Sequence, residues 1–198
     1  MNNNDNREQY LNNAAALIYA DLIAPAILAL SIDNLPTLSY QISLGSLAKP
    51  TKTLGVCWAK AASSANNNEI FLSPFEDDSH LMLSTLLHEL IHATLDNQDG
   101  HKGRFARLAK QCMLTGKMTA TTPTTELLAY FDDVISTLGK LPHAKLDIKK
   151  RPNVQKNRQL LVACNCCRFK FRASRTQILS MKYDNCLACD NGKLSVQD

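Results

Sequence analysis

The segment His88-Glu89-Leu90-Ile91-His92 constrains this chain more than any other part of its sequence. Four residues span slightly more than one turn of an α-helix, so His88 and His92 would project from the same helix face, about 6 Å apart. This separation suits two ligands of a tetrahedral metal ion, and a catalytic zinc ion keeps three protein ligands and one water, whose pKa falls to about 7. Glu89 could take the proton of that water as it attacks a carbonyl group. The segment therefore predicts a helix that carries a catalytic zinc site.

The alternative is an ordinary amphipathic helix with two histidines at this spacing, which chance would produce in roughly one chain of this length in a hundred. The surrounding sequence argues against chance. Asp77 and Asp78 can cap a helix, apolar residues follow at helical spacing, and Gly100 is a stop signal, so we expect a helix near residues 79–97. A His-Glu-His face without partners would be costly among the leucines of such a helix.

The third ligand decides which class of metallohydrolase is indicated. A metzincin needs Gly and His at fixed positions after the motif, and this chain has Leu and Gln there, which excludes that class. A thermolysin-like enzyme would take a Glu from a second helix, but Glu126, the only downstream Glu, has no ligand-like surroundings. Asp96 and Asp99 are possible oxygen ligands, although Asp99 more naturally shapes an Asp-Gly turn. His101, on a short loop between two helices, is the better nitrogen ligand, with a surface histidine as the alternative.

These residues resemble the SprT-like metallopeptidases, whose eukaryotic members include the Spartan protease. Residues 85–93 around the motif, the later Asp-Gly-His at 99–101 and Phe105 carry the resemblance. Residues 54–58 and 69–74 are similar to the two strands that precede the active-site helix in this family. The resemblance covers roughly residues 35–115.

The resemblance implies zinc on His88, His92 and His101, with Glu89 as the catalytic base. It also implies proteolysis, which in the best-understood relatives is directed at proteins bound or crosslinked to DNA. One departure is visible: the family often continues Gly-His-Gly-Pro-Glu-Phe, whereas residues 100–105 read Gly-His-Lys-Gly-Arg-Phe, so the local charge is basic rather than acidic.

Two Cys-x-x-Cys pairs near the C-terminus form a second metal motif. Cys164 and Cys167 are separated by eighteen residues from Cys186 and Cys189, a spacing typical of a Cys₄ zinc site. Four thiolates leave no open position, so this zinc would be structural, and a module of about 40 residues needs the metal to fold. Cys166 could replace Cys164 as a ligand, but the two-residue spacing favours Cys164.

Disulfide pairing is the alternative for these cysteines, and it would require an oxidising compartment. The first eight residues are polar and do not resemble a secretory signal. The apolar stretch 14–30 is interrupted by an Asp and a Pro, which indicates one or two amphipathic helices rather than a membrane span. We therefore expect a cytoplasmic protein that does not contact membranes and whose cysteines bind metal.

The expected fold is of the α+β class: a small antiparallel sheet packed with helices that carry the zinc site, followed by a Cys₄ zinc ribbon. Composition places a metallopeptidase domain at 1–139, a basic linker at 140–158 and the ribbon at 159–198. We expect strands near 36–44, 53–60 and 69–73, and helices near 103–115 and 123–138, the last with Pro123 in its first turn.

Charge is divided unevenly between these parts. Residues 1–139 hold 9 Lys and Arg against 14 Asp and Glu, and residues 140–198 hold 13 against 4, a net charge of +9. Such a basic tail is typical of a nucleic-acid tether. The residues that could neutralise phosphates are Lys149, Lys150, Arg151, Lys156, Arg158, Arg168, Lys170, Arg172 and Arg175, and those that could stack on unpaired bases are Phe169, Phe171 and Tyr183. Alternatively, the cations only solvate a small domain and the Phe residues pack one face of it.

Three functions compete on this evidence. The first is a zinc-dependent endopeptidase that cleaves DNA-associated or DNA-crosslinked proteins, held on single-stranded or sequence-nonspecific DNA by its ribbon. The second is a non-catalytic zinc-ribbon protein that binds nucleic acid, and the third is a regulatory metalloprotease that cleaves a specific protein, such as a repressor, without DNA. The first requires two Zn²⁺ ions, one catalytic and one structural. His80 and Tyr130 are conceivable electrophilic helpers in the catalytic site.

Overall fold

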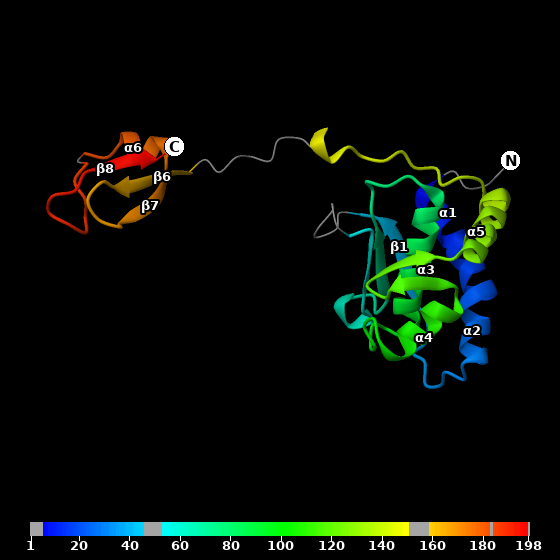
Figure 1. Ribbon diagram of the computed structural model, residues 1–198. Helices are drawn as coiled ribbons and strands as arrows, with labels where there is room; N and C mark the ends of the chain where they lie inside the picture. Colours follow the sequence, from blue (N-terminus) through cyan, green and yellow to red (C-terminus); the bar gives the residue numbers. More distant parts are fainter. Residues whose placement is uncertain (1–5, 46–52, 151–158, 183, 198) are drawn as a thin grey trace. The chain divides into compact units, whose positions relative to one another are not determined.

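The computed structural model describes residues 6–45, 53–150, 159–182 and 184–197. They belong to two compact units, Met1–Ile148 and Lys149–Asp198, which Figure 1 draws with their helices and strands. The combination of helices and small sheets confirms the α+β class. The segment directly after residue 139 lies against the first unit, because Leu141 is buried there and the Leu146 N–H donates to the Pro74 carbonyl at 2.9 Å.

The sheet of the first unit has three strands in the order β1-β3-β2. They are β1 (Tyr40–Leu44), β2 (Gly55–Trp58) and β3 (Asn68–Leu72), and each lies within or close to its predicted range. The prediction of an antiparallel sheet is wrong for one pair: β3 is antiparallel to β2 but parallel to β1. The chain reverses direction between β1 and β2 and again between β2 and β3. β3 therefore runs in the same direction as β1 beside it.

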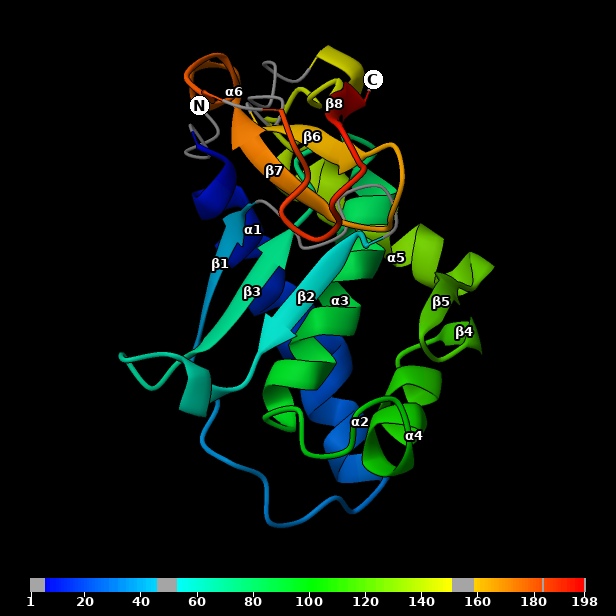
Figure 2. The same ribbon diagram turned by 90° about the vertical axis from the view of Figure 1, so that its left-hand side faces the viewer.

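Two helices, α1 (Arg7–Ile18) and α3 (Ser79–Thr94), pack on one face of this sheet (Figure 2). α3 begins where predicted, because the Asp78 carboxylate accepts the Leu81 N–H at 2.7 Å. It ends before Asn97, since Asp96 and Asn97 adopt left-handed backbone angles with φ of 47° and 59°. Four leucines of α3, Leu83, Leu86, Leu87 and Leu90, are fully buried, whereas Leu81 near its start is exposed, so the helix that carries the motif lies at the centre of the core.

The N-terminal helical run consists of α1, a π-helical turn (Tyr19–Ile23) and α2 (Ala24–Ala29). Among the described residues, this run alone is long and apolar enough to cross a membrane. Leu11, Ile18 and Ile23 are nevertheless fully buried in the core. The run therefore packs as the core helix of this unit, as its interrupted apolar pattern predicted.

The predicted helix 103–115 is shorter in the structure, because α4 spans only Gly103–Gln111. Met113 has a left-handed φ of 62°, and a hairpin of β4 (Leu114–Lys117) and β5 (Ala120–Pro123) follows. Pro123 thus ends a strand and is not in the first turn of α5 (Thr125–Leu138), which Thr124 caps. The threonines of this segment favour extended backbone, a preference that the helical prediction overlooked.

The second unit is a small antiparallel sheet of the order β7-β6-β8 with one short helix, α6 (Arg175–Leu179). Its strands are β6 (Gln159–Cys164), β7 (Lys170–Ser174) and β8 (Leu194–Gln197). The first two flank the first cysteine pair, as predicted. Among the described residues of this unit, only Val162, Ala173 and Cys186 are buried apolar side chains, so apolar burial alone would stabilise it weakly.

Candidate metal centre and active site

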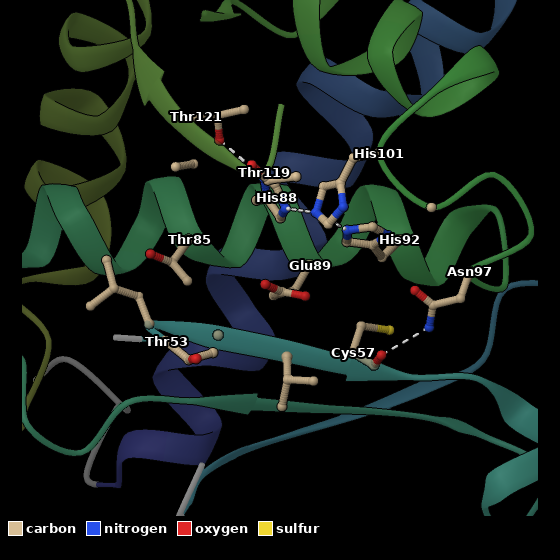
Figure 3. Close-up of a pocket in the computed structure, with 15 residues that line it drawn as sticks. Thr53, Cys57, Thr85, His88, Glu89, His92, Asn97, His101, Thr119 and Thr121 are labelled. Carbon is tan, nitrogen blue, oxygen red and sulfur yellow. Dashed lines mark hydrogen bonds between the residues drawn. The ribbon is translucent and has the colours of Figure 1, made fainter. Parts of the chain in front are cut away.

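Three imidazoles from two parts of the first unit converge on one point. His88 and His92 come from α3, and His101 comes from the loop before α4 (Figure 3). The Nε2 atom of His101 lies 3.2 Å from that of His88 and 3.1 Å from that of His92. Two nitrogens bound to tetrahedral zinc at about 2.05 Å would lie roughly 3.3 Å apart. The three predicted ligands are therefore brought together with a spacing that fits a zinc ion.

The possible carboxylate ligands are engaged elsewhere. Asp96 accepts the Lys60 N–H and the Asn68 side-chain amide, both at 2.9 Å. Asp99 pairs with Arg104, and Glu126 is exposed on α5. Within the described part of the chain, the group of potential ligand atoms at this site consists of the three histidines alone.

Burial keeps these imidazoles neutral. Burial, assisted by the neighbouring imidazoles, lowers the pKa of His88 to about 4 and that of His92 to about 3. The pKa of His101 is also lowered by burial. Phe105, itself fully buried, stacks on the His92 ring with centroids 4.2 Å apart. At neutral pH, the nitrogen lone pairs are thus free to bind a metal ion.

A threonine orients the first histidine. The Nδ1 atom of His88 lies 3.0 Å from the Thr121 hydroxyl of β5. A metal ligand of this kind gives its remaining N–H to an acceptor, which fixes the tautomer and the ring orientation. The hairpin that interrupts the predicted helix therefore contributes directly to the site.

Glu89 is buried between α3 and β2, with 6% of its surface exposed. Burial raises its pKa to about 8, and a hydrogen bond from the Cys57 backbone N–H opposes this rise. β2 can approach so closely because Gly55 faces the helix: a Cβ there would lie 2.8 Å from Glu89 Oε1 and 2.7 Å from Thr85 Cγ2. The Glu89 carboxylate therefore lies directly against the backbone of β2, beside Gly55 and within a hydrogen bond of the Cys57 N–H.

The histidines and Glu89 line an open cleft of about 460 Å³. The beginning of β2 borders it on one side and the hairpin residues Thr119–Thr121 on the other (Figure 3). Its lining is otherwise uncharged, with no Lys, Arg or Asp among the described residues that border it. The cleft thus offers polar hydroxyls and apolar surface around a single buried carboxylate.

The SprT-like family model matches residues 28–126, half of the chain. The chain belongs to the SprT-like family. The matched region contains the three histidines and Glu89 but ends before the cysteine pairs. No curated protein and no solved structure matches the chain. Family membership brings a metallopeptidase-like fold and a metal-binding site, which is the site that the structure assembles.

Several residues that shape this SprT-like site were missed from the sequence. Gly55 had a detectable signal, since a glycine inside a strand often marks the close approach of another group. Thr121 and the Cys57 backbone had none, because their roles depend on contacts across the fold. The two conceivable helpers do not line the cleft: His80 Nε2 pairs with Asp132 at 2.8 Å, and the Tyr130 hydroxyl donates to Asp21 at 3.0 Å.

The four predicted cysteines of the second unit also meet. The Sγ atoms of Cys164 and Cys189 lie 3.7 Å apart, as do those of Cys167 and Cys186. A disulfide requires about 2.05 Å, whereas two sulfurs on tetrahedral zinc lie roughly 3.8 Å apart. Cys166 is exposed and outside the group, although its N–H donates to Cys164 Sγ. The cluster is consistent with a zinc ribbon in which Cys164 is the ligand.

The arrangement of the four cysteines explains two further features of this unit. Backbone N–H groups, that of Cys167 foremost, lower the pKa of Cys164 to about 6, which favours the thiolate that binds metal. A Cβ at Gly192 would collide with Cys164 Sγ and would lie 2.7 Å from Cys189 Sγ, so the turn after the second knuckle requires glycine.

The predicted phosphate-binding residues are only partly described. Arg168, Lys170, Arg172 and Arg175 are exposed on the second unit, and Lys149 and Lys150 form a single helical turn with Ile148. Arg151, Lys156, Arg158 and Tyr183 lie outside the described residues. Phe169 and Phe171 are half-buried and contact each other, with ring centroids 5.9 Å apart. Phe171 and Arg172 point to opposite faces of β7, so this Phe packs on the face away from the cations.

Proposed function

We propose that this SprT-like protein is a zinc-dependent endopeptidase that acts through His88, Glu89, His92 and His101. The convergence of three neutral imidazoles beside a buried carboxylate, in an open cleft, is the observation that carries the proposal. A zinc ion held by the three histidines would act as a Lewis acid and lower the pKa of a water molecule.

Glu89 performs the proton transfers. Its carboxylate accepts a proton from the water that attacks the peptide carbonyl, and it then delivers this proton to the leaving amine. A base must be ionised at working pH, and a nearby divalent cation favours the carboxylate that burial alone disfavours. The Cys57 N–H acts in the same direction and keeps the carboxylate against β2.

The uncharged cleft supports an extended, neutral stretch of polypeptide as the substrate at the scissile bond. β2 is the last strand in the order β1-β3-β2 and pairs with β3. Its first residues, Gly55, Val56 and Cys57, line the cleft. A charged side chain next to the buried Glu89 would lose hydration without gaining a partner from this lining. We infer that cleavage occurs in flexible or unfolded segments of protein substrates.

We further propose that the second unit binds DNA without sequence preference and brings the peptidase to DNA-associated or DNA-crosslinked proteins. The support is electrostatic: the region 140–198 has a net charge of +9, and its described cations Arg168, Lys170, Arg172 and Arg175 are exposed. Clustered cations bind phosphates by releasing counterions, a sequence-independent interaction.

The deciding experiment is a cleavage assay with zinc-loaded full-length protein and a DNA-binding protein as substrate, with and without single-stranded DNA. Glu89→Gln should reduce cleavage by about 10²- to 10⁴-fold while zinc remains bound. Glu126→Gln, which changes an exposed carboxylate on α5, is the matched control and should cleave normally. Equal cleavage by wild type and Glu89→Gln would refute Glu89 as the base, and no cleavage by either would refute the peptidase and favour a protein that only binds nucleic acid.

The DNA proposal is tested separately by salt. Affinity for single-stranded DNA should fall steeply as salt rises, and Lys170→Gln with Arg172→Gln should reduce the slope of log affinity against log salt by about 1 to 2. Lys110→Gln on α4 should leave this slope unchanged. Cleavage without any retention on DNA at low salt would instead favour a regulatory protease with a specific protein substrate.

A further inference from the structure

His101 differs from the other two histidines because no helix holds it. His88 and His92 are fixed by α3, which is buried in the core, whereas His101 is half-buried in the loop between α3 and α4. A loop ligand loses conformational entropy when it binds a metal ion, unless the loop is already fixed. The contacts that fix this loop therefore affect how tightly the site binds metal.

One ion pair closes this loop. Asp99 precedes His101 by two residues and Arg104 follows it by three. Arg104 Nη2 donates to Asp99 Oδ1 at 2.7 Å, and Arg104 Nε donates to Oδ2 at 3.1 Å. The Arg104 backbone N–H also donates to Oδ2, at 2.7 Å. One carboxylate thus binds both the side chain and the main chain at the start of α4.

The pair is better placed than an ordinary surface salt bridge. The Asp99 and Arg104 side chains are 16% and 28% exposed, and a forked Arg–carboxylate contact is both stronger and more directional than a single ionic contact. The backbone is adapted to it as well: Gly103 has a φ of +50°, and a Cβ there would lie 2.9 Å from Asp99 Oδ2. A side chain at this position would push the carboxylate away.

We propose that Asp99 and Arg104 are positioning residues of the metal site, which hold the His101 loop closed so that its imidazole stands ready beside His88 and His92. This inference rests on the zinc site of the proposed function. It assigns Asp99 a role in holding a ligand in place, although the carboxylate itself does not bind the metal. The site would then bind zinc with a ligand set that is already formed.

The test is the zinc affinity of the full-length protein, measured by competition with a chelator. The three-histidine component is the one that disappears in His101→Ala, and the four-cysteine component remains as an internal reference. Asp99→Asn and Arg104→Gln should each raise the dissociation constant for zinc about tenfold, the lower end of the effect of groups that hydrogen-bond a metal ligand directly, because this pair acts on His101 through its loop. The double variant should raise the dissociation constant no more than the single variant with the larger effect, because both substitutions break the same contact.

The matched control is Arg107→Gln, on the same helix, whose side chain donates to the Leu30 carbonyl at 2.9 Å. Its zinc affinity should remain that of wild type. Arg104→Lys keeps the charge without the fork and should give an intermediate affinity; it decides the question if Asp99→Asn fails to fold, as judged by circular dichroism.

Two results would overturn the proposal: folded variants whose zinc affinity stays within twofold of wild type, or a double variant whose loss is the product of the two single losses. Since zinc binding is measured without a substrate, an inactive wild-type protein would refute the peptidase and leave this result intact.

Discussion

Gly55 is the residue on which the position of Glu89 depends most closely. A methyl group on Gly55 would lie 2.8 Å from Glu89 Oε1 and 2.9 Å from its Cγ, so the carboxylate or the strand must move. Displacement of a catalytic group by about 1 Å costs up to about 100-fold in rate. We therefore expect the smallest residue of the site to have a larger effect on the proposed catalysis than its chemistry suggests.

We expect Gly55→Ala to lower cleavage at least tenfold and the free energy of unfolding by about 1–3 kcal/mol, since it overpacks a buried contact. Zinc should remain bound, because the atoms nearest to the new methyl group belong to Thr85 and Glu89 and not to the three histidines. Gly45→Ala is the matched control: its Cβ would lie 2.8 Å from Phe71 Cδ1, so stability should fall but activity should not. Equal activity of the two variants would contradict this account of Gly55.

The buried Glu89 should also make stability depend on pH when metal is absent. Its pKa is raised from about 4.5 to about 8, so between these values the folded state keeps a proton that the unfolded state releases. The free energy of unfolding should then fall as pH rises, by up to about 1.4 kcal/mol per pH unit, and Glu89→Gln should lack this decline. Urea denaturation of both chelator-treated proteins between about pH 6 and pH 8 measures the difference.

His88 and His92 act with the opposite sign, since their lowered pKa values weaken the folded state below about pH 6.5. Both proteins contain these histidines, so their contributions to the free energy of unfolding cancel when wild type is compared with Glu89→Gln. Bound zinc should flatten the difference, because the cation favours the carboxylate. Parallel curves for the two metal-free proteins would contradict the raised pKa.

At the scale of elements, the end of α3 is attached to the sheet. The Asn97 side-chain amide donates to the Cys57 carbonyl of β2 at 2.8 Å, and Cys57 in turn donates its N–H to Glu89. Asp96 accepts the Lys60 N–H and the Asn68 amide beside it. Helix and strand are thereby kept in the register that the candidate metal site needs.

We expect Asn97→Ala to destabilise the protein by about 1–3 kcal/mol. The variant loses the hydrogen bond to Cys57, and alanine adopts the left-handed φ of 59° at this position less readily than asparagine or glycine. Asn97→Gly tolerates that φ and should show the cost of the hydrogen bond alone. Asn66→Ala, at a φ of 55° in an exposed loop, gives the backbone cost alone. If Asn97→Ala costs no more than Asn66→Ala in denaturant unfolding, the contact with Cys57 contributes nothing.

At the scale of the whole molecule, two separate groups of ligands predict two independent zinc ions. Metal analysis should find about two zinc ions in wild type and one each in His101→Ala and Cys186→Ser, because each substitution removes a ligand from only one group. Cys186→Ser should also lose DNA binding yet keep some DNA-independent cleavage. Loss of both metals from either single variant would show that the two units fold together.

The parts of this protein that could be predicted from sequence depend on short-range geometry. The histidine pair needs only one helical turn, each cysteine pair needs only one knuckle, and the start of α3 needs only Asp78. Fold class and family follow from the same local signals. The nucleic-acid role rests on charge alone and stays a prediction.

The tertiary structure alone decided what depends on contacts between distant segments. The parallel pairing of β1 with β3 and the hairpin that brings Thr121 to His88 have no signature in local spacing. Burial of Glu89 likewise requires that β2, more than thirty residues earlier, reach α3 at a glycine. The sequence by itself therefore determined the histidine pair of α3 and the two cysteine pairs, because the members of each pair are neighbours along one turn, and the family resemblance added His101. The fold decided how the site is held and how its base is tuned, because packing and desolvation arise only once distant segments meet.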